Sequence, residues 1–320
     1  MIKNNIIKNT DHLQAEVRDG VGIIAFNRPE AKNALSDELT PELRRMLIEF
    51  ESDRDVRVII ITGNGGSFCS GGDVKSFASD SDPGLSKDLS LEQQIRKLQI
   101  GQEGVSLKIH EMPKPTIAVL PGAAAGAGMS IALACDIRIA SEKAFLVPAF
   151  GGIGLSGDYG GSWSLSQLVG PSKAKDIYFS NRRIQAKDAL DEGIINYVVS
   201  ESDLESFALQ KASEIAYFSP TALQYMKENH NRATSTNFKE SLAMEADRMI
   251  RCFQTEDHKN AAKAFVEKKK PKSLQRQRVE AGVRKEVVYK VPKKISGDLT
   301  MTHSGKSASV QAVLKVKDTE

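Results

Sequence analysis

Apolar and polar residues follow one another along the chain in a pattern that predicts strands followed by helices. Residues 17–26 alternate or cluster apolar side chains around Asp19-Gly20, as a hairpin of two strands would. Residues 39–50 repeat apolar side chains at intervals of three and four, which predicts an amphipathic helix capped by Ser36. The apolar run 58–62 then predicts a buried strand. Strand and helix therefore alternate, which is typical of an α/β architecture with parallel strands.

Two apolar runs lead directly into turns rich in small residues. Residues 58–62 precede the glycine-rich run 63–73, and residues 116–120 precede the run 121–136, which continues as a helix of small residues. Glycine lets the main chain bend sharply and approach a ligand closely. The first N–H groups of a helix lack partners within it and lie at the positive end of its dipole. Two such turns could each direct one N–H group at a single point, as an acyl-transfer or enolate site requires.

The second half of the chain combines short strands, another glycine-rich run and a series of helices. We expect strands at 136–140 and 194–199, and a glycine-rich run at 145–161 that contains one carboxylate, Asp158. The expected helices cover 89–109, 162–169, 172–179 with Ser172 as its cap, 186–192, 204–217, a helix capped at Ser219, 238–253 and 256–268. A helical end of this kind often forms subunit contacts.

Composition and charge narrow the class of protein. A chain of 320 residues with 40% hydrophobic content can bury a full core. Three scattered cysteines and five histidines without a spaced cluster argue against a disulfide framework and against a metal site. No signal peptide or long apolar span is evident, so we expect a cytoplasmic protein without a membrane segment. From residue 271 onward, eleven Lys and Arg stand against five acids, which predicts a solvated basic tail.

Five motifs in a fixed order resemble those of the crotonase, or enoyl-CoA hydratase/isomerase, superfamily. They are Asn-Arg-Pro-x-x-x-Asn-Ala-Leu (27–35), Ser-Phe-Cys-Ser-Gly-Gly-Asp (67–73), Pro-Lys-Pro-Thr-Ile-Ala-Val (113–119), Gly-x-x-x-Gly-x-Gly (122–128) and Cys-Asp-Ile-Arg-Ile-Ala (135–140). The resemblance implies a crotonase-like spiral of ββα units with a C-terminal helical trimerisation region, and therefore a homotrimer or hexamer. The divisions that we expect are a loose N-terminal segment (1–14), an α/β core (15–200), a helical region (201–270) and the basic tail (271–320).

The resemblance also implies an acyl-CoA substrate, with coenzyme A as part of the substrate and no separate cofactor. By motif position, the N–H groups of Gly72 and Ala127 would stabilise the enolate oxygen of the thioester. The other residues expected to bind substrate are Arg28, Lys32, Ala34, Ser70, Gly71, Asp73, Val74, Lys75, Gly126, Phe150, Leu155 and Trp163. Among them, Arg28 and Lys32 would lie near the phosphates of the coenzyme, whereas Asp73 is expected to hold its own turn. The basic tail leaves binding to nucleic acid open, but it lacks interleaved aromatic residues.

The chain departs from the family at the two glutamates that family hydratases use. By motif position these are Ser130 and Phe150, and neither side chain can move a proton. The carboxylate left in this region is Asp158, in a run that resembles the site of a catalytic aspartate in dienoyl-CoA isomerases and of the nucleophilic aspartate in 4-chlorobenzoyl-CoA dehalogenases. If Phe150, Leu155 and Trp163 line its pocket, burial would raise its pKa.

We therefore expect an enoyl-CoA isomerase with Asp158 as acid and base. Two alternatives stay open: an enoyl-CoA hydratase, a lyase, in which Asp158 positions a water, and a non-catalytic relative that binds CoA or acts as a scaffold. Asp158 also stands just before an expected helix, where aspartate is a favoured N-cap, so a purely structural role is a further alternative.

Overall fold

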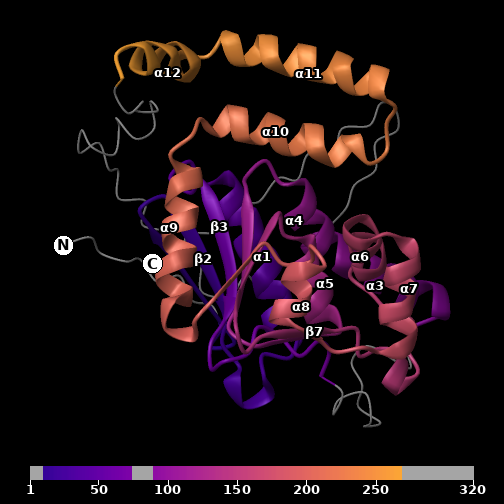
Figure 1. The fold of residues 1–320 in the computed structure, drawn as a ribbon. Coiled ribbons are helices and arrows are strands. Elements are labelled where there is room, and N and C mark those ends of the chain that lie inside the picture. Colours follow the sequence, from indigo (N-terminus) through magenta and orange to yellow (C-terminus); the bar gives the residue numbers. More distant parts are fainter. Residues whose placement is uncertain (1–9, 74–88, 269–320) are drawn as a thin grey trace, which may run out of the picture. The chain divides into compact units, whose positions relative to one another are not determined.

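The computed structural model describes residues 10–73 and 89–268, which form two sheets with helices packed around them (Figure 1). The larger sheet has six strands in the order β1-β2-β3-β4-β6-β9. Its strands are β1 (Leu13–Arg18), β2 (Val21–Phe26), β3 (Val58–Gly63), β4 (Thr116–Leu120), β6 (Ile137–Ser141) and β9 (Tyr197–Val199). Only the hairpin of β1 and β2 is antiparallel, and the other neighbours in this sheet are parallel. The predicted α/β architecture with parallel strands is confirmed.

A smaller sheet differs from the sequence-based prediction. It consists of β5 (Ala123–Ala125), β7 (Phe145–Val147) and β8 (Ile184–Gln185), in the order β5-β7-β8. The three alanines of β5 occupy a stretch that we expected to be a bare turn, so helix α5 (Ala127–Ala134) begins only after them. Alanine is depleted in strands and these strands are short, which explains why the pattern did not reveal them.

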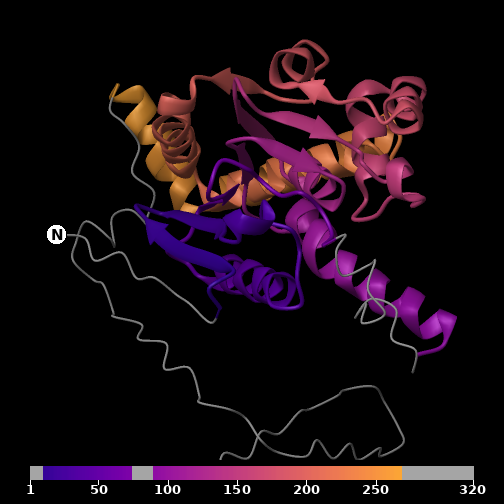
Figure 2. The ribbon, with the colours of Figure 1, turned by 90° about the horizontal axis from the view of Figure 1, so that it is seen from below.

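The helices follow the apolar periodicity closely. In α1 (Leu39–Ser52) the N-cap residue is Glu38, but the Ser36 hydroxyl accepts a hydrogen bond from the Leu39 N–H at 3.0 Å, so Ser36 satisfies the first N–H of the helix as we expected of a cap. The expected helix 89–109 consists of α3 (Leu91–Gln102), a π-helical segment at Glu103–Leu107 and α4 (Lys108–Glu111). In Figure 2 the outer part of α3 extends at the lower right. The remaining helices are α6 (Gly161–Val169), α7 (Pro171–Ser180), α8 (Ala186–Asp191), α9 (Leu204–Ala216), α10 (Pro220–Ala233), α11 (Phe238–Phe253) and α12 (Glu256–Val266).

One predicted cap is wrong. Ser172 lies inside α7, which begins at Pro171 and has Gly170 as its N-cap. Proline favours the first position of a helix because its ring fixes φ and because the N–H that it lacks would have no partner there. The chain therefore enters the helix one residue before the serine.

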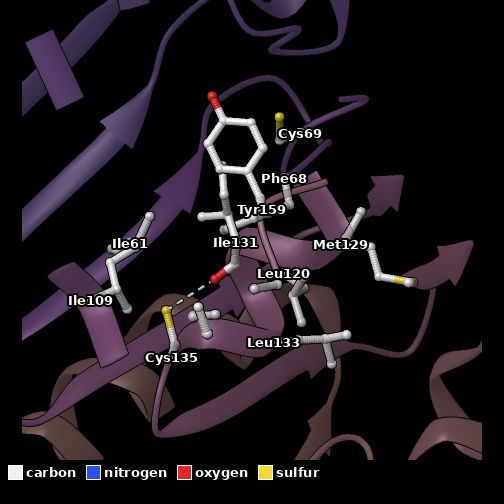
Figure 3. Packing of buried hydrophobic residues seen from close by; sticks show 14 of the residues in the cluster. Ile61, Phe68, Cys69, Ile109, Leu120, Met129, Ile131, Leu133, Cys135 and Tyr159 are labelled. Atoms are coloured by element: carbon white, nitrogen blue, oxygen red, sulfur yellow. Dashed lines mark hydrogen bonds between the residues drawn. The ribbon is translucent and has the colours of Figure 1, made fainter. Parts of the chain in front are cut away.

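Helix α5 is packed within the hydrophobic core around its whole circumference. All eight residues of α5 are buried, because its side chains are small or apolar around the whole circumference. Figure 3 shows Ile131 of this helix near Phe68 and Tyr159, which come from segments distant in the sequence. A second cluster of buried residues lies under α9, where Val58 and Ile60 of β3 pack with Ala208 and Ala212. The N-terminus of α5 is thus fixed rigidly relative to the larger sheet.

The last two helices bury little of their own surface. Among the described residues, α11 and α12 contain no buried side chain, and Phe238 and Phe265 are 79% and 84% exposed. Figure 1 shows α11 alongside α10, on the side away from the sheet. Such an apolar surface fits the expected subunit contact, but the trimer stays a prediction. Within 10–73 and 89–268, no helix has the length and apolar content needed to cross a membrane. The expected boundaries after 14, 200 and 270 also stay predictions, and the basic tail lies outside the described residues.

Candidate active site

The two glycine-rich turns lie side by side. Cys69 and Ala124 form a parallel bridge, in which the N–H of Ala125 donates to the carbonyl of Cys69 at 2.9 Å. Further along, Gly71 has φ +93° and lies against the start of α5. A Cβ on Gly71 would lie 2.9 Å from the Ala125 oxygen and 3.3 Å from the Ala127 nitrogen. Only glycine fits this conformation and this distance, so the residue type itself brings the turns together.

The N–H groups of Gly72 and Ala127 donate to no acceptor among the residues that the structure describes. Ala127 is the first residue of α5, where the helix itself offers its N–H no acceptor. Gly72 is held next to Leu35 by a parallel bridge, while the Leu35 N–H donates to the Gly71 carbonyl at 2.8 Å. Two neighbouring free donors are what an oxyanion site needs. That both point at one oxygen stays a prediction.

Arg28 lies differently from a phosphate ligand. Its side chain is 15% exposed, donates to the Ala34 carbonyl at 2.9 Å, and lies 3.4 Å from the Asp73 carboxylate. Arg28 therefore ties the 27–35 motif to the end of the first turn. Asp73 pairs across to this motif, and its expected role in its own turn stays a prediction. The carbonyl of Ala34 is likewise already engaged.

Lys32 is the better placed of the two basic residues for a phosphate. It is exposed, in the left-handed conformation with φ +50°, and its carbonyl accepts from the N–H of Ser70 at 3.0 Å. The Ser70 hydroxyl in turn donates to the carbonyl of Ala31 at 3.2 Å. Ser70 thus fastens Lys32 beside the first turn. Val74 and Lys75, which we also expected to bind substrate, lie outside the described residues.

Asp158 is the acidic residue that we expected to act as acid and base. Its carboxylate makes no hydrogen bond with any described residue, and its Oδ1 atom is buried. Burial raises the pKa of Asp158 to about 6. The structural alternative, an N-cap, is not what the side chain does: Gly160 is the N-cap of α6, and only the Asp158 main-chain carbonyl accepts, from Gly161 at 3.2 Å. A buried carboxyl group with a pKa near neutrality suits general acid–base chemistry.

Tyr159 fixes the position of Asp158. It has φ +51°, which is unusual for a residue with a side chain, and its side chain is 7% exposed. The ring belongs to the core cluster with Phe68 and Cys69, and Figure 3 shows these residues close together. Its N–H donates to the Gln102 side chain at 3.2 Å. Burial, and to a smaller extent the charge of Asp158, raise the pKa of Cys69 to about 12, so this thiol stays neutral.

Phe150 lies near the second turn, as we expected. A Cβ on Gly126 would lie 3.8 Å from the Phe150 ring and 3.8 Å from the Cα of Gly71. The ring also stacks on Tyr178, with 6.3 Å between centroids and an interplanar angle of 10°. Gly157, with φ +118°, lies close to both rings, because a Cβ added at this position would lie 3.4 Å from the Tyr178 ring and 3.7 Å from the Phe150 ring. The two aromatic rings and the two turns therefore form one continuous contact.

Leu155 and Trp163 are more exposed than pocket residues usually are. Half of each side chain is in solvent, with 50% exposed for Leu155 and 47% for Trp163. The edge of the Trp163 ring meets His110 of α4, with 5.2 Å between centroids. That these two residues line the acyl pocket stays a prediction.

Sequence reasoning missed Tyr178. This residue of α7 places its hydroxyl beside Ser130, the residue at the first glutamate position. Gly161 lies against both hydroxyls, because a Cβ added at this position would lie 2.2 Å from Ser130 Oγ and 2.6 Å from Tyr178 Oη. Ser130 Oγ donates to the Gly126 carbonyl at 3.3 Å. No motif marks Tyr178, since its role depends on how α7 packs against α6.

A cavity between described residues has a lining that includes none of the expected site residues. It has a volume of about 420 Å³, lies between α9 and the larger sheet, and is lined mainly by apolar residues such as Ile23, Ile60 and Leu204. Two of the acids at its rim, Glu16 and Glu205, pair with Arg18. We therefore locate the site by its donors and its carboxylate rather than by this cavity. Within the described part of the chain, no group of three His, Cys, Asp or Glu side chains could hold a metal ion.

Comparison with known proteins identifies the family. Residues 16–276 match the enoyl-CoA hydratase/isomerase family. The short-chain-enoyl-CoA hydratase of Clostridium acetobutylicum is 36% identical over 250 residues, which are 78% of this chain and 92% of that protein. The structure of an enoyl-CoA hydratase from Polaromonas sp. superposes with a TM-score of 0.75 at 32% identity, covering 81% of this chain and 98% of that one. An enoyl-CoA hydratase from Bacillus anthracis gives a TM-score of 0.72 at 30% identity, covering 84% and 97%. The crotonase fold is confirmed, and the chain belongs to the enoyl-CoA hydratase/isomerase family.

Proposed function

We propose that this protein is an enoyl-CoA isomerase that shifts a carbon–carbon double bond through a thioester enolate, with Asp158 as acid and base. Family membership supports an acyl-CoA reaction of this general type. The observation that carries the finer proposal is the partly buried carboxylate of Asp158, whose Oδ1 atom is buried without a hydrogen-bond partner and whose pKa is raised to about 6. The charge of Asp158 contributes to the raised pKa of Cys69, which supports a place for this carboxylate near the first turn and its Gly72 N–H group.

The two N–H groups would accept the developing charge on the thioester oxygen. One such donor typically lowers the barrier by about 3 kcal/mol. From a 3-enoyl thioester, the Asp158 carboxylate removes a proton from C2, and the C–H electron pair forms the C1–C2 double bond of a dienolate. The protonated Asp158 then returns the proton to C4, where the C3–C4 π electrons take it. The C1–C2 π electrons move to form the C2–C3 double bond, and a lone pair of the enolate oxygen restores the carbonyl. One carboxylate therefore completes the cycle, with no other reactant consumed.

Hydration is the second candidate, because the relatives compared above are named enoyl-CoA hydratases. The resemblance implies that the two glutamate positions hold Ser130 and Phe150, which argues against the two-glutamate route because neither side chain carries a carboxylate. Hydration would instead need Asp158 to hold and deprotonate a water. The non-catalytic alternative gives no reason for an unpaired buried carboxyl group, which costs stability wherever it serves no ligand.

The substitution Asp158→Asn tests the proposal. It keeps the shape of the side chain and removes the base, so we expect turnover of 3-enoyl-CoA thioesters to fall about 10²-fold or more. Binding of a saturated acyl-CoA should change by no more than a few-fold. Asp176→Asn is the matched control, because Asp176 is an exposed carboxylate on α7, and it should retain activity.

Full activity of the Asp158→Asn variant would contradict the acid–base role. The products separate the two reactions, since isomerisation yields a 2-enoyl thioester from a 3-enoyl thioester, whereas hydration of a 2-enoyl thioester yields a 3-hydroxyacyl thioester. A wild-type protein that binds acyl-CoA but converts neither substrate would favour the scaffold alternative.

A further inference from the structure

The loop that carries Asp158 is mostly exposed and depends on a few contacts. Residues 151–157 and Gly160 are exposed, whereas Asp158 is partly buried and Tyr159 is buried. Tyr159 has φ +51°, a conformation that is uncommon for a residue with a side chain. Such a conformation persists only where the surrounding structure holds it. The contacts of Tyr159 therefore decide where the main chain of Asp158 lies.

The peptide group between Asp158 and Tyr159 has both of its polar atoms engaged. The Asp158 carbonyl accepts from the Gly161 N–H at 3.2 Å, and the Tyr159 N–H donates to Oε1 of Gln102 at 3.2 Å. Among the described residues, the bond to Gln102 is the one hydrogen bond that ties 150–160 to a segment distant in the sequence. Because a peptide group is planar, this bond orients the main chain that carries Asp158.

Gln102 is itself held at a defined place. It is the last residue of α3 and is followed directly by the π-helical segment Glu103–Leu107. Such segments are rare in proteins and occur often at functional sites. Arg44 of α1 packs against this junction, because a Cβ added at Gly104 would lie 2.7 Å from Arg44 Cδ. Helix α1 therefore supports the position from which Gln102 reaches the loop.

We propose that Gln102 is a positioning residue for Asp158: its amide oxygen holds the Tyr159 N–H and thereby keeps the Asp158 carboxylate in the orientation that proton transfer needs. This inference rests on the proposed function, in which Asp158 moves the proton. The carboxylate makes no hydrogen bond of its own with any described residue, so its direction depends on the main chain that carries it. A neutral acceptor suits this place, because a second carboxylate nearby would raise the pKa of Asp158.

The described thiol and phenols that respond to the charge of Asp158 stay neutral in the pH range of an assay. They are the side chains of Cys69, Tyr159 and Tyr178. Burial is the first cause that raises the pKa of each to about 12. Arg44, whose charge acts on Tyr159 in the opposite direction, is an arginine and stays charged throughout. A change in the titration of Asp158 can therefore be read without titration of these neighbours.

Two substitutions of Gln102 should change the pKa of Asp158 in opposite directions. Gln102→Met removes the acceptor at similar length, so the loop is released, the carboxylate gains water, and its pKa should fall from about 6 toward its ordinary value. Gln102→Glu keeps an acceptor and adds a negative charge, so the pKa of Asp158 should rise by about 0.5 pH unit or more.

Urea denaturation from pH 4 to pH 8 measures this pKa. Each Gln102 variant is compared with the same variant carrying Asp158→Asn, because the difference in unfolding free energy then follows the titration of Asp158. The carboxyl group added by Gln102→Glu is present in both proteins of its pair. Gln99→Met and Gln99→Glu are the matched controls and should leave the pKa unchanged. Gln99 is exposed, lies three residues earlier in α3 and donates to Glu103 at 2.7 Å.

Turnover gives a second measurement. Gln102→Met should lower kcat for 3-enoyl-CoA thioesters about tenfold or more and leave KM within about twofold, because it displaces the base and not the coenzyme. In the Asp158→Asn background the same substitution should lower kcat by about twofold or less, since Gln102 acts through Asp158. Equal losses in the two backgrounds would show a general structural effect and overturn the proposal.

An unchanged pKa of Asp158 in both Gln102 variants would also overturn it, and Gln102→Glu decides alone if Gln102→Met does not fold. The outcome is separable from the acid–base proposal, because the pKa is measured without turnover. Opposite pKa changes in the two variants, together with full turnover of Asp158→Asn, would refute only the acid–base role. Lost turnover of Asp158→Asn with no pKa change in either Gln102 variant would refute only the inference on Gln102.

Discussion

Replacing Asp158 by Asn should stabilise the folded protein at pH 8 and change it little at pH 4. Burial raises the pKa of this carboxyl group from 3.8 to about 6 in the folded state. The folded state therefore binds the proton more tightly than the unfolded state, and the stability contributed by this group falls as the pH rises from about 4 through about 6. The rise of this pKa from 3.8 to about 6 corresponds to about 3 kcal/mol in the free energy of unfolding. This is an upper value, because part of the side chain reaches solvent.

Urea denaturation at intervals from pH 4 to pH 8 would measure this effect. The quantity of interest is the difference in unfolding free energy between Asp158→Asn and wild type at each pH, at a fixed protein concentration. The Asn amide does not titrate, so any constant cost of the amide drops out of the pH dependence. Asp176→Asn should give a flat difference. A difference for Asp158→Asn that varies by less than about 0.5 kcal/mol over this range would refute the reasoning, since surface groups produce changes of that size.

Other predictions follow from the same structure. Gly128→Ala should destabilise the protein by about 1–3 kcal/mol and lower kcat, because the new Cβ would lie 2.2 Å from the Cys69 carbonyl and push the two turns apart. Gly151→Ala is the control in the same denaturation and activity assays, because a Cβ at that position would meet open space. The rate constant kcat/KM for isomerisation should fall about tenfold per pH unit below about pH 6, as Asp158 gains a proton, and a profile flat to pH 4.5 would contradict this role. Light scattering should give a trimer or hexamer closed by α11 and α12, and a monomer at micromolar concentration would rule that out.

Most of the fold could be predicted from the sequence because apolar periodicity and turn residues agree along most of the chain. The run 58–62 and the helix from Leu39 are examples, and both lie within a residue or two of their predicted bounds. The smaller sheet could not be predicted, since Ala123–Ala125 has no side-chain pattern of its own. Its strands are set by hydrogen bonds from segments far away in the chain.

The site was predictable at its main chain and less so at its side chains. Gly71 could be identified because only glycine permits its close approach to the second turn, and Gly126 because its φ of +53° favours glycine. The difference between Arg28 and Lys32 could not, because both are basic and only packing decides that Arg28 turns inward to Ala34. Tyr178 is a further example, since nothing in the sequence of α7 indicates that its tyrosine lies beside Ser130.

The contact of Gly161 with Ser130 and Tyr178 has a consequence for the evolution of this enzyme. A glutamate at position 130 would need room that the α6 main chain and the Tyr178 ring now occupy. A glutamate at position 130 of α5 would therefore need compensating changes in α6 and α7. Without them, the single substitution would destabilise the packing of these helices. The proposed reliance on Asp158 alone would therefore be hard to replace by a single substitution at position 130.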